Sequence, residues 1–402
     1  MQNQSSHTQN IQAPLVSFII TTYNMPTEYL EECLKSILQL SLNSKEREII
    51  LVDDGSDICA INGITEYLQD IIYLRQPSQG ASVARNYGMM IAKGRFIQFV
   101  DGDDYLVQTA YEHCLDIVRY HQPDIVTFNY VKNRQTDTPP YELPTPISGT
   151  AYMSNHNLHG SACSYIFRSS IRGTLQFTPG IVYGEDEEFT PQLFLRAERI
   201  FKMETEAYYY RENPNSVTHQ MDHEKISQKM DNSLEVILNL QKLLDKIPVA
   251  ERQALSRRIA QLSMDYLTNA IAAAGDHAGI NAVAAQAVDS GLTDGVCGEL
   301  GDEGCVQTVV GQRNSNVGLA AAEGELQAVS LNETLVVEGL QTDHQFAKSN
   351  DFHWLFSFIS GVSSSRRRAY PVRRGFYGKR GQALMPAPDG RQSRRSRLPC
   401  SR

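Results

Sequence analysis

Short apolar runs alternate with helical segments over the first third of the chain, and this alternation limits the possible folds most strongly. The runs are rich in Ile, Val and Phe and are predicted strands at residues 15–22, 48–54, 71–74, 95–100 and 124–129. Between the first two runs, apolar residues from Leu30 to Leu38 follow one face of a helix. Strands that alternate with helices form mostly parallel sheets through right-handed crossovers. We therefore predict an α/β fold with a mixed, mostly parallel sheet flanked by helices.

Polar and acidic residues follow three of these runs where they end, in the segments TTYN, VDDGS and VDGDD. Ligands of such sheets bind beyond the carboxyl ends of the strands. Asp101 and Asp103, separated by Gly102, can present oxygens to a hard cation such as Mg²⁺ or Mn²⁺. The alternative is a charged turn that caps the next helix, since Asp is favoured at helix starts.

Two further segments extend this edge. Asp53 and Asp54 in VDDGS can accept hydrogen bonds from a nucleotide base or ribose, with a simple turn as the alternative. Arg85, in GASVARNYG, has a guanidinium suited to phosphate, with an ordinary surface arginine as the alternative. The order of residues excludes a Walker phosphate loop.

The segments IITTYN, EIILVDDGS, GASVARNYG and FVDGDD, in this order, resemble family 2 of the inverting nucleotide-sugar-dependent glycosyltransferases. The resemblance is strong from Pro14 to Asp104 and weaker up to His219. It implies the Rossmann-like GT-A fold, a nucleotide-sugar donor and a divalent metal, Mn or Mg. The chain departs from the family pattern at Thr21, where most members have proline.

The resemblance also implies roles for single residues. Thr21 and Tyr23 are expected to contact the base, Asp53 or Asp54 to take its imide hydrogen, and Arg85 to lie near the base or diphosphate. Asp103 is the first choice for the metal. Asp101 is expected on the ribose or near the metal, and Asp104 is a less certain addition.

The later segment GEDEEF resembles the family's ED motif, which points to Asp186 as the catalytic base and to Glu185 as second choice. The alternative is a helix whose acidic first turn is favoured by the helix dipole. Arg211 and His219, in YYYRENPNSVTH, are expected to close the site over the donor phosphates, with His219 also a candidate metal ligand. An ordinary strand and loop is the alternative there.

Composition supports a core of one or two domains in a chain of 402 residues that is 41% hydrophobic and carries a net charge of -9. No run reaches the roughly 18 apolar residues of a membrane span. The first ten residues are polar, unlike a secretory signal. We expect a cytoplasmic protein, with peripheral association at the inner membrane face left open, and no nucleic-acid partner.

The predicted organisation is a polar tail at 1–13, a glycosyltransferase domain at 14–220 and C-terminal helices at 221–271. The domain divides into a donor half at 14–130 and an acceptor half at 131–220. Residues 272–402 change character, with a Gly- and Ala-rich block followed by a basic end. We interpret them as a low-order tail without a second functional domain. An ordinary disordered tail and a replacement of the native end, for example by a shifted reading frame, are the two explanations.

The function predicted from the sequence is transfer of a sugar, from a UDP-sugar, to a hydroxyl of a polysaccharide or lipid-linked glycan with inversion. Two alternatives stay open: a nucleotide-sugar binding protein without turnover, and a nucleotidyltransferase. The sequence does not indicate the sugar, the acceptor or the oligomeric state.

Overall fold

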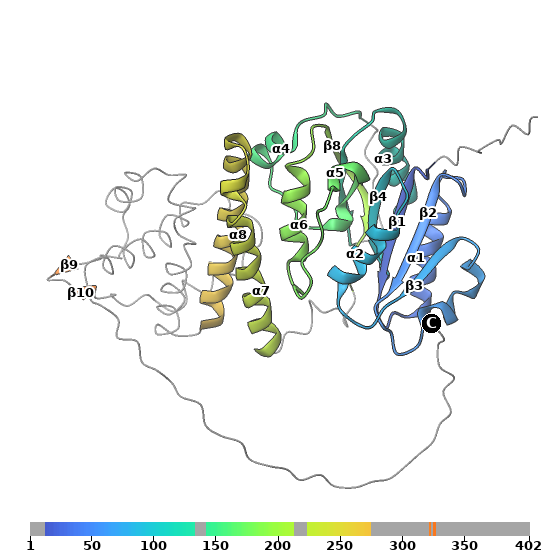
Figure 1. Ribbon diagram of the computed structural model, residues 1–402, viewed down its shortest axis with the longest axis horizontal. Coiled ribbons are helices and arrows are strands. Elements are labelled where there is room, and N and C mark those ends of the chain that lie inside the picture. Colours follow the sequence, from blue (N-terminus) through green and yellow to red (C-terminus); the bar gives the residue numbers. More distant parts are fainter. Residues whose placement is uncertain (1–12, 133–141, 213–222, 275–320, 323–324, 327–402) are drawn as a thin grey trace, which may run out of the picture. The chain divides into compact units, whose positions relative to one another are not determined.

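The computed structural model describes residues 13–132, 142–212, 223–274, 321–322 and 325–326 (Figure 1). The chain divides into two compact units, 1–299 and 300–402. In the second unit the described residues are β9 (Ala321–Ala322) and β10 (Glu325–Leu326), which pair antiparallel. The predicted domain boundaries stay predictions, and almost all of the predicted tail lies outside the described residues.

The first unit contains one sheet whose strands were largely predicted. Its strands are β1 (Val16–Thr22), β2 (Arg47–Asp53), β3 (Ile71–Arg75), β4 (Phe96–Asp101), β5 (Tyr105–Leu106), β6 (Ile125–Val131), β7 (Tyr165–Arg168) and β8 (Ile200–Tyr209). They are arranged in the order β3-β2-β1-β4-β7-β6-β8-β5. The four neighbouring strands β3, β2, β1 and β4 are parallel to one another. Strand β7 is antiparallel to its neighbours β4 and β6, and β6 and β8 are parallel. The predicted mixed, mostly parallel α/β sheet is confirmed.

Helices connect and cover the strands. They are α1 (Thr27–Leu38), α2 (Ala81–Ile91), α3 (Gln108–Tyr120), α4 (Gly149–Asn155), α5 (Ser169–Arg172), α6 (Glu185–Phe194), α7 (His223–Gln241) and α8 (Val249–Ala274). Short 3-10 turns occupy Ala60–Gly63, Thr65–Tyr67, Ala162–Ser164 and Leu244–Lys246. Helices α7 and α8 form the C-terminal helical segment that the sequence predicted at 221–271. Within the described residues, no helix has the length and apolar character needed to cross a membrane.

The register of the parallel strands brings the polar strand ends together. Thr22 on β1 pairs with Asp53 on β2, and Thr21 pairs with Asp101 on β4. The carboxyl ends of these strands therefore form one edge, as the sequence predicted, and the later segments approach that edge from α6 and β8.

An aromatic cluster fastens α6 to the sheet. The Phe189 ring on α6 stacks on Phe177 with centroids 4.1 Å apart, and it meets Phe99 of β4 and Phe167 of β7 edge-on at 6.3 Å. All four side chains are fully buried. Burial of large aromatic side chains is a major source of folding free energy, so this cluster fixes the start of α6 relative to the end of β4.

We expect Phe189→Ala to lower the free energy of unfolding by about 3–5 kcal/mol, because it removes a buried ring and leaves a cavity. Phe189→Leu, which fills more of the space, should cost less. Chemical denaturation followed by circular dichroism measures both values. Equal stability of Phe189→Ala and the unaltered protein would contradict this account of the core.

Candidate active site

The acidic turn after β4, Asp101 to Asp104, lies against the end of β1. The Gly102 backbone N–H donates to the Thr21 carbonyl at 3.0 Å, and a Cβ added at Gly102 would lie 3.0 Å from that same oxygen. The Asp104 N–H donates to the Asp101 carbonyl at 3.0 Å and closes the turn. Glycine is required here by the close approach of two backbones.

The turn does not cap the following helix. Helix α3 begins at Gln108, its N-cap is Val107, and the cap makes no side-chain hydrogen bond. The alternative interpretation of the acidic cluster as a helix cap is therefore wrong. The carboxylates have other partners.

Asp104 is buried and ties the turn to β8. Its carboxylate accepts a hydrogen bond from the Tyr208 hydroxyl at 2.7 Å and another from the Arg211 backbone N–H at 2.8 Å. Burial, with the neighbouring charges of Asp101 and Asp103, raises the pKa of Asp104 to about 8, although the Arg211 and Tyr208 hydrogen bonds oppose the rise. We interpret Asp104 as a residue that positions the turn.

Arg211 holds the same turn from the outside. Its Nε donates to the Asp103 carbonyl at 2.7 Å, and its Nη2 pairs with Glu32 on α1. Its guanidinium also lies over the Tyr29 ring, 4.2 Å from the centroid. These contacts make Arg211 a clamp on the acidic turn, and contact with donor phosphates stays a prediction. His219 lies outside the described residues.

Arg85 connects the acidic turn to α6. Its Nη2 donates to Asp101 at 3.2 Å, and its Nη1 donates to Glu185 at 2.8 Å and to Asp186 at 3.1 Å. The guanidinium is buried, and it lies over the Phe177 ring at 5.3 Å. The sequence suggested direct contact between Arg85 and the donor. In the structure Arg85 binds three carboxylates, so we interpret it as a positioning residue, and its place near the base or diphosphate stays a prediction.

Asp186 has the environment of a general base. Its other oxygen accepts a hydrogen bond from the Ala162 N–H at 3.0 Å. Burial raises the pKa of Asp186 to about 7; the charge of Arg85 opposes the rise, and the charges of Glu185 and Asp101 add to it. A carboxylate with a pKa near neutrality is suited to accept a proton from a hydroxyl. The first turn of α6 is indeed acidic, as the alternative interpretation required, but Glu185 and Asp186 have specific partners.

Asp53 and Asp54 are occupied by protein donors. Asp53 accepts from the Ser56 N–H at 2.8 Å and the Tyr73 hydroxyl at 2.7 Å, and Asp54 accepts from the Gly80 N–H at 2.8 Å. Burial disfavours the charged form of Asp53, yet its hydrogen bonds hold its pKa below the usual range. Both carboxylates shape the loops beside the site, and a contact with the nucleotide base stays a prediction.

The remaining predicted donor contacts lie on the edge of β1. The Thr21 hydroxyl donates to Asp101 across 3.5 Å, at the limit of a hydrogen bond. Tyr23 is 53% exposed and therefore available to a base. The contacts of Thr21 and Tyr23 with the donor base stay predictions.

A cavity of about 300 Å³ opens beside the turn. Its lining comprises Asp101, Asp104, Tyr130, Lys132, Ser161, Cys163, Ser164, Tyr208 and Tyr210. The cavity adjoins the acidic turn, and Ser161 and Cys163 in its lining flank Ala162, whose N–H donates to Asp186. Sequence analysis missed Tyr208 and the 161–164 segment. The three consecutive tyrosines before Arg211 were the only signal for Tyr208.

Comparison with known proteins identifies the domain. Residues 17–171 match the family described as Glycosyl transferase family 2. Over these residues the chain is similar to the family 2 glycosyltransferases. The match extends from the first strand through the acidic turn to α5.

Individual relatives agree with this family. The uncharacterized glycosyltransferase EpsJ of Bacillus subtilis is 33% identical over 220 residues, which cover 51% of this chain and 63% of that protein. The poly(ribitol-phosphate) beta-N-acetylglucosaminyltransferase TarS of Staphylococcus aureus is 24% identical over 200 residues, which cover 48% of this chain and 35% of that protein. The chain thus spans less than two thirds of either relative.

A solved structure of S. aureus TarS, residues 1–349 in complex with UDP-GlcNAc, is similar with a TM-score of 0.48 and 16% identity. The similarity covers 71% of this chain and 91% of that one. The family assignment depends on the sequence matches alone.

The Asp53 carboxylate accepts hydrogen bonds from the Ser56 N–H and the Tyr73 hydroxyl. We expect Asp53→Asn to lower the free energy of unfolding by about 1–3 kcal/mol in the absence of ligand, because an amide cannot replace the carboxylate as acceptor for all of these donors. Asp57→Asn, at an exposed neighbouring carboxylate, is the control and should change stability little. Thermal unfolding without donor measures the difference. Unchanged stability with lost donor binding would favour direct contact with the base.

Proposed function

We propose that the family 2 domain transfers a sugar from a UDP-sugar to a hydroxyl of a cell-surface polysaccharide or lipid-linked glycan, with inversion of the anomeric carbon. The family match supports sugar transfer, and the TarS relative is, by its name, a poly(ribitol-phosphate) beta-N-acetylglucosaminyltransferase. The observation that carries the proposal is the pair of contacts through which Arg85 joins Asp101 to Asp186.

Asp186 is the proposed base. The acceptor hydroxyl gives its proton to the Asp186 carboxylate while its oxygen forms the bond to the anomeric carbon. The bond from that carbon to the diphosphate breaks on the opposite face, and the nucleoside diphosphate leaves with the electron pair. Glu185 contributes through its charge, which helps to keep the pKa of Asp186 high.

Asp101 and Asp103 are the proposed ligands of a divalent metal, Mn or Mg. Their oxygens are the hard donors that these ions prefer. Burial raises the pKa of Asp104, and the charges of Asp101 and Asp103 add to the rise; a cation would relieve the repulsion between these carboxylates. Among the described residues no group of three or more acidic, His or Cys side chains is arranged around a metal position. Diphosphate oxygens and water would therefore complete the coordination.

The metal, when bound, would offset charge on the departing diphosphate. The protein's own part is to hold the two carboxylates in place. Arg85 fixes Asp101 from the core side, and Arg211 fixes the Asp103 backbone from the other. Positions fixed before the reaction avoid reorganisation during it.

We also propose that the protein is located in the cytoplasm and takes its nucleotide-sugar donor there. A peripheral position at the inner face of the membrane is the alternative.

We expect Asp186→Asn to reduce transfer by about 100- to 10,000-fold, the usual contribution of a positioned base, while donor binding is kept. Asp103→Asn should instead weaken metal-dependent donor binding together with transfer. Titration calorimetry with UDP and Mn²⁺, beside a transfer assay, separates the two effects. Transfer at the full rate by Asp186→Asn would show that the base has been assigned wrongly.

The products distinguish the proposal from its two alternatives. A glycosyltransferase releases free nucleoside diphosphate as the acceptor gains a sugar, whereas a nucleotidyltransferase releases inorganic pyrophosphate. A binding protein without turnover releases neither. Phosphorus NMR of a reaction with UDP-sugar and Mn²⁺ should show UDP, and pyrophosphate would contradict the proposal.

A further inference from the structure

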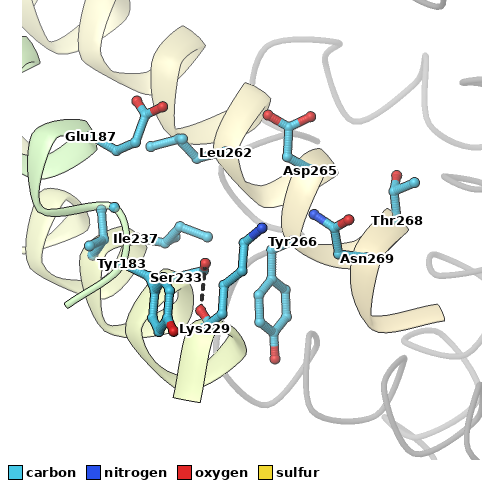
Figure 2. A pocket seen from close by; sticks show the side chains of 12 residues that line it. Tyr183, Glu187, Lys229, Ser233, Ile237, Leu262, Asp265, Tyr266, Thr268 and Asn269 are labelled. Atoms are coloured by element: carbon cyan, nitrogen blue, oxygen red, sulfur yellow. Dashed lines mark hydrogen bonds between the residues drawn. The ribbon is translucent and has the colours of Figure 1, made fainter. Parts of the chain in front are cut away.

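A second cleft lies on the other flank of α6, between its first turn and helices α7 and α8 (Figure 2). Its volume is about 410 Å³, within the range of ligand pockets. Gly184 and Glu187, on either side of the Glu185–Asp186 pair, belong to its lining. We call this space the α6–α8 cleft.

The cleft combines an apolar wall with polar side chains. Val236 and Ile237 of α7 are buried, and Leu262 of α8 faces them across the cleft. Figure 2 shows Lys229 extending from α7 into the space between the helices, on the side where Asp265 and Asn269 project from α8. Such a surface suits a sugar ring, because the apolar wall can contact the C–H face of the ring and the polar side chains can bind its hydroxyls.

The polar side chains of the cleft are available to a ligand. Among the residues that the structure describes, the side chains of Lys229, Asp265 and Asn269 have no hydrogen-bond or ion-pair partner. Together they offer acceptors and donors, and hydroxyls can pair with both kinds of group. Glu187 differs, because it is held in an ion pair by Arg258 of α8.

The charges of the cleft favour a neutral ligand. Lys229 contributes one positive charge and Asp265 one negative charge, while Glu187 is compensated by Arg258. Because these charges balance, the cleft as a whole attracts neither a highly charged anion nor a cation, and Asp265 would repel an anion beside it while Lys229 would repel a cation. Hydroxyl-rich neutral sugars pair with all of these groups without that repulsion.

We propose that the α6–α8 cleft binds a neutral segment of the glycan acceptor, away from the hydroxyl that reacts. The cleft and the proposed base share the first turn of α6, so a glycan held by α7 and α8 would pass beside the transfer centre. The identity of the ligand as a glycan rests on the proposed function. The existence of a site for a neutral hydroxyl-rich ligand rests on the cleft alone.

The test is calorimetric titration of the full chain with three tetrasaccharides. Two are neutral, cellotetraose and chitotetraose, and the third is the anionic tetragalacturonate. We expect at least one neutral tetrasaccharide to bind, and tetragalacturonate to bind more weakly. Asp265→Ala and Asn269→Ala should each weaken binding by about tenfold, as expected for loss of a hydrogen bond to a sugar.

Ser154→Ala, at an exposed position on α4 outside the cleft, is the matched control and should bind like the unaltered protein. Binding of none of the three probes, stronger binding of tetragalacturonate, or binding unaffected by both cleft substitutions would overturn the proposal. The Asp186→Asn transfer assay fails or succeeds independently, because its readout is turnover without added tetrasaccharide.

Discussion

The buried guanidinium of Arg85 is the interaction on which the arrangement of the site depends. It makes ion pairs with Asp101 at the end of β4 and with Glu185 and Asp186 at the start of α6. These residues are far apart in the sequence, and each alone would be a poorly compensated charge near the core. Removal of one partner from a buried ion pair typically costs about 3–5 kcal/mol. Arg85 therefore makes the acidic turn and the proposed base parts of one unit.

A second set of contacts holds the acidic turn from the opposite side. Arg211 donates to the Asp103 carbonyl, and Asp104 accepts from Tyr208 and from the Arg211 backbone. The turn thus has fixed partners from both β8 and α2. Its carboxylates are held close together, and burial together with the charges of Asp101 and Asp103 raises the pKa of Asp104. The aromatic cluster around Phe189 supplies the rigid support below α6.

Much of the fold could be predicted because its signals are local. The strand runs, the two C-terminal helices and the gathering of acids at one edge follow from hydrophobic period and from parallel pairing. The short strand β7 was not anticipated, because its four residues have no distinguishing period and it enters between β4 and β6 from a later part of the chain.

Site roles were harder to predict, because they depend on partners from distant segments. Asp54 is occupied by Gln76 and the Gly80 N–H, and neither partner is indicated by the VDDGS segment itself. Likewise, the local sequence around Arg85 does not show whether its guanidinium binds a phosphate or a set of carboxylates. The sequence alone therefore predicts a place near the donor. The Asp186 assignment came from resemblance, and its burial and its Arg85 and Ala162 contacts give it a physical basis.

The central claim is that Asp186 is a base whose pKa is raised by burial and held down by Arg85, and the pH dependence of kcat/KM tests it most directly. For the unaltered protein we predict an acidic limb with an apparent pKa of about 7, because Asp186 must lose its proton to act. Burial, Glu185 and Asp101 raise the pKa of Asp186, while Arg85 and the Ala162 N–H lower it. In Arg85→Gln the positive charge is gone, so the limb should move to higher pH, whereas Arg85→Lys should move it less. An acidic limb at the same pH in all three folded proteins would contradict the account.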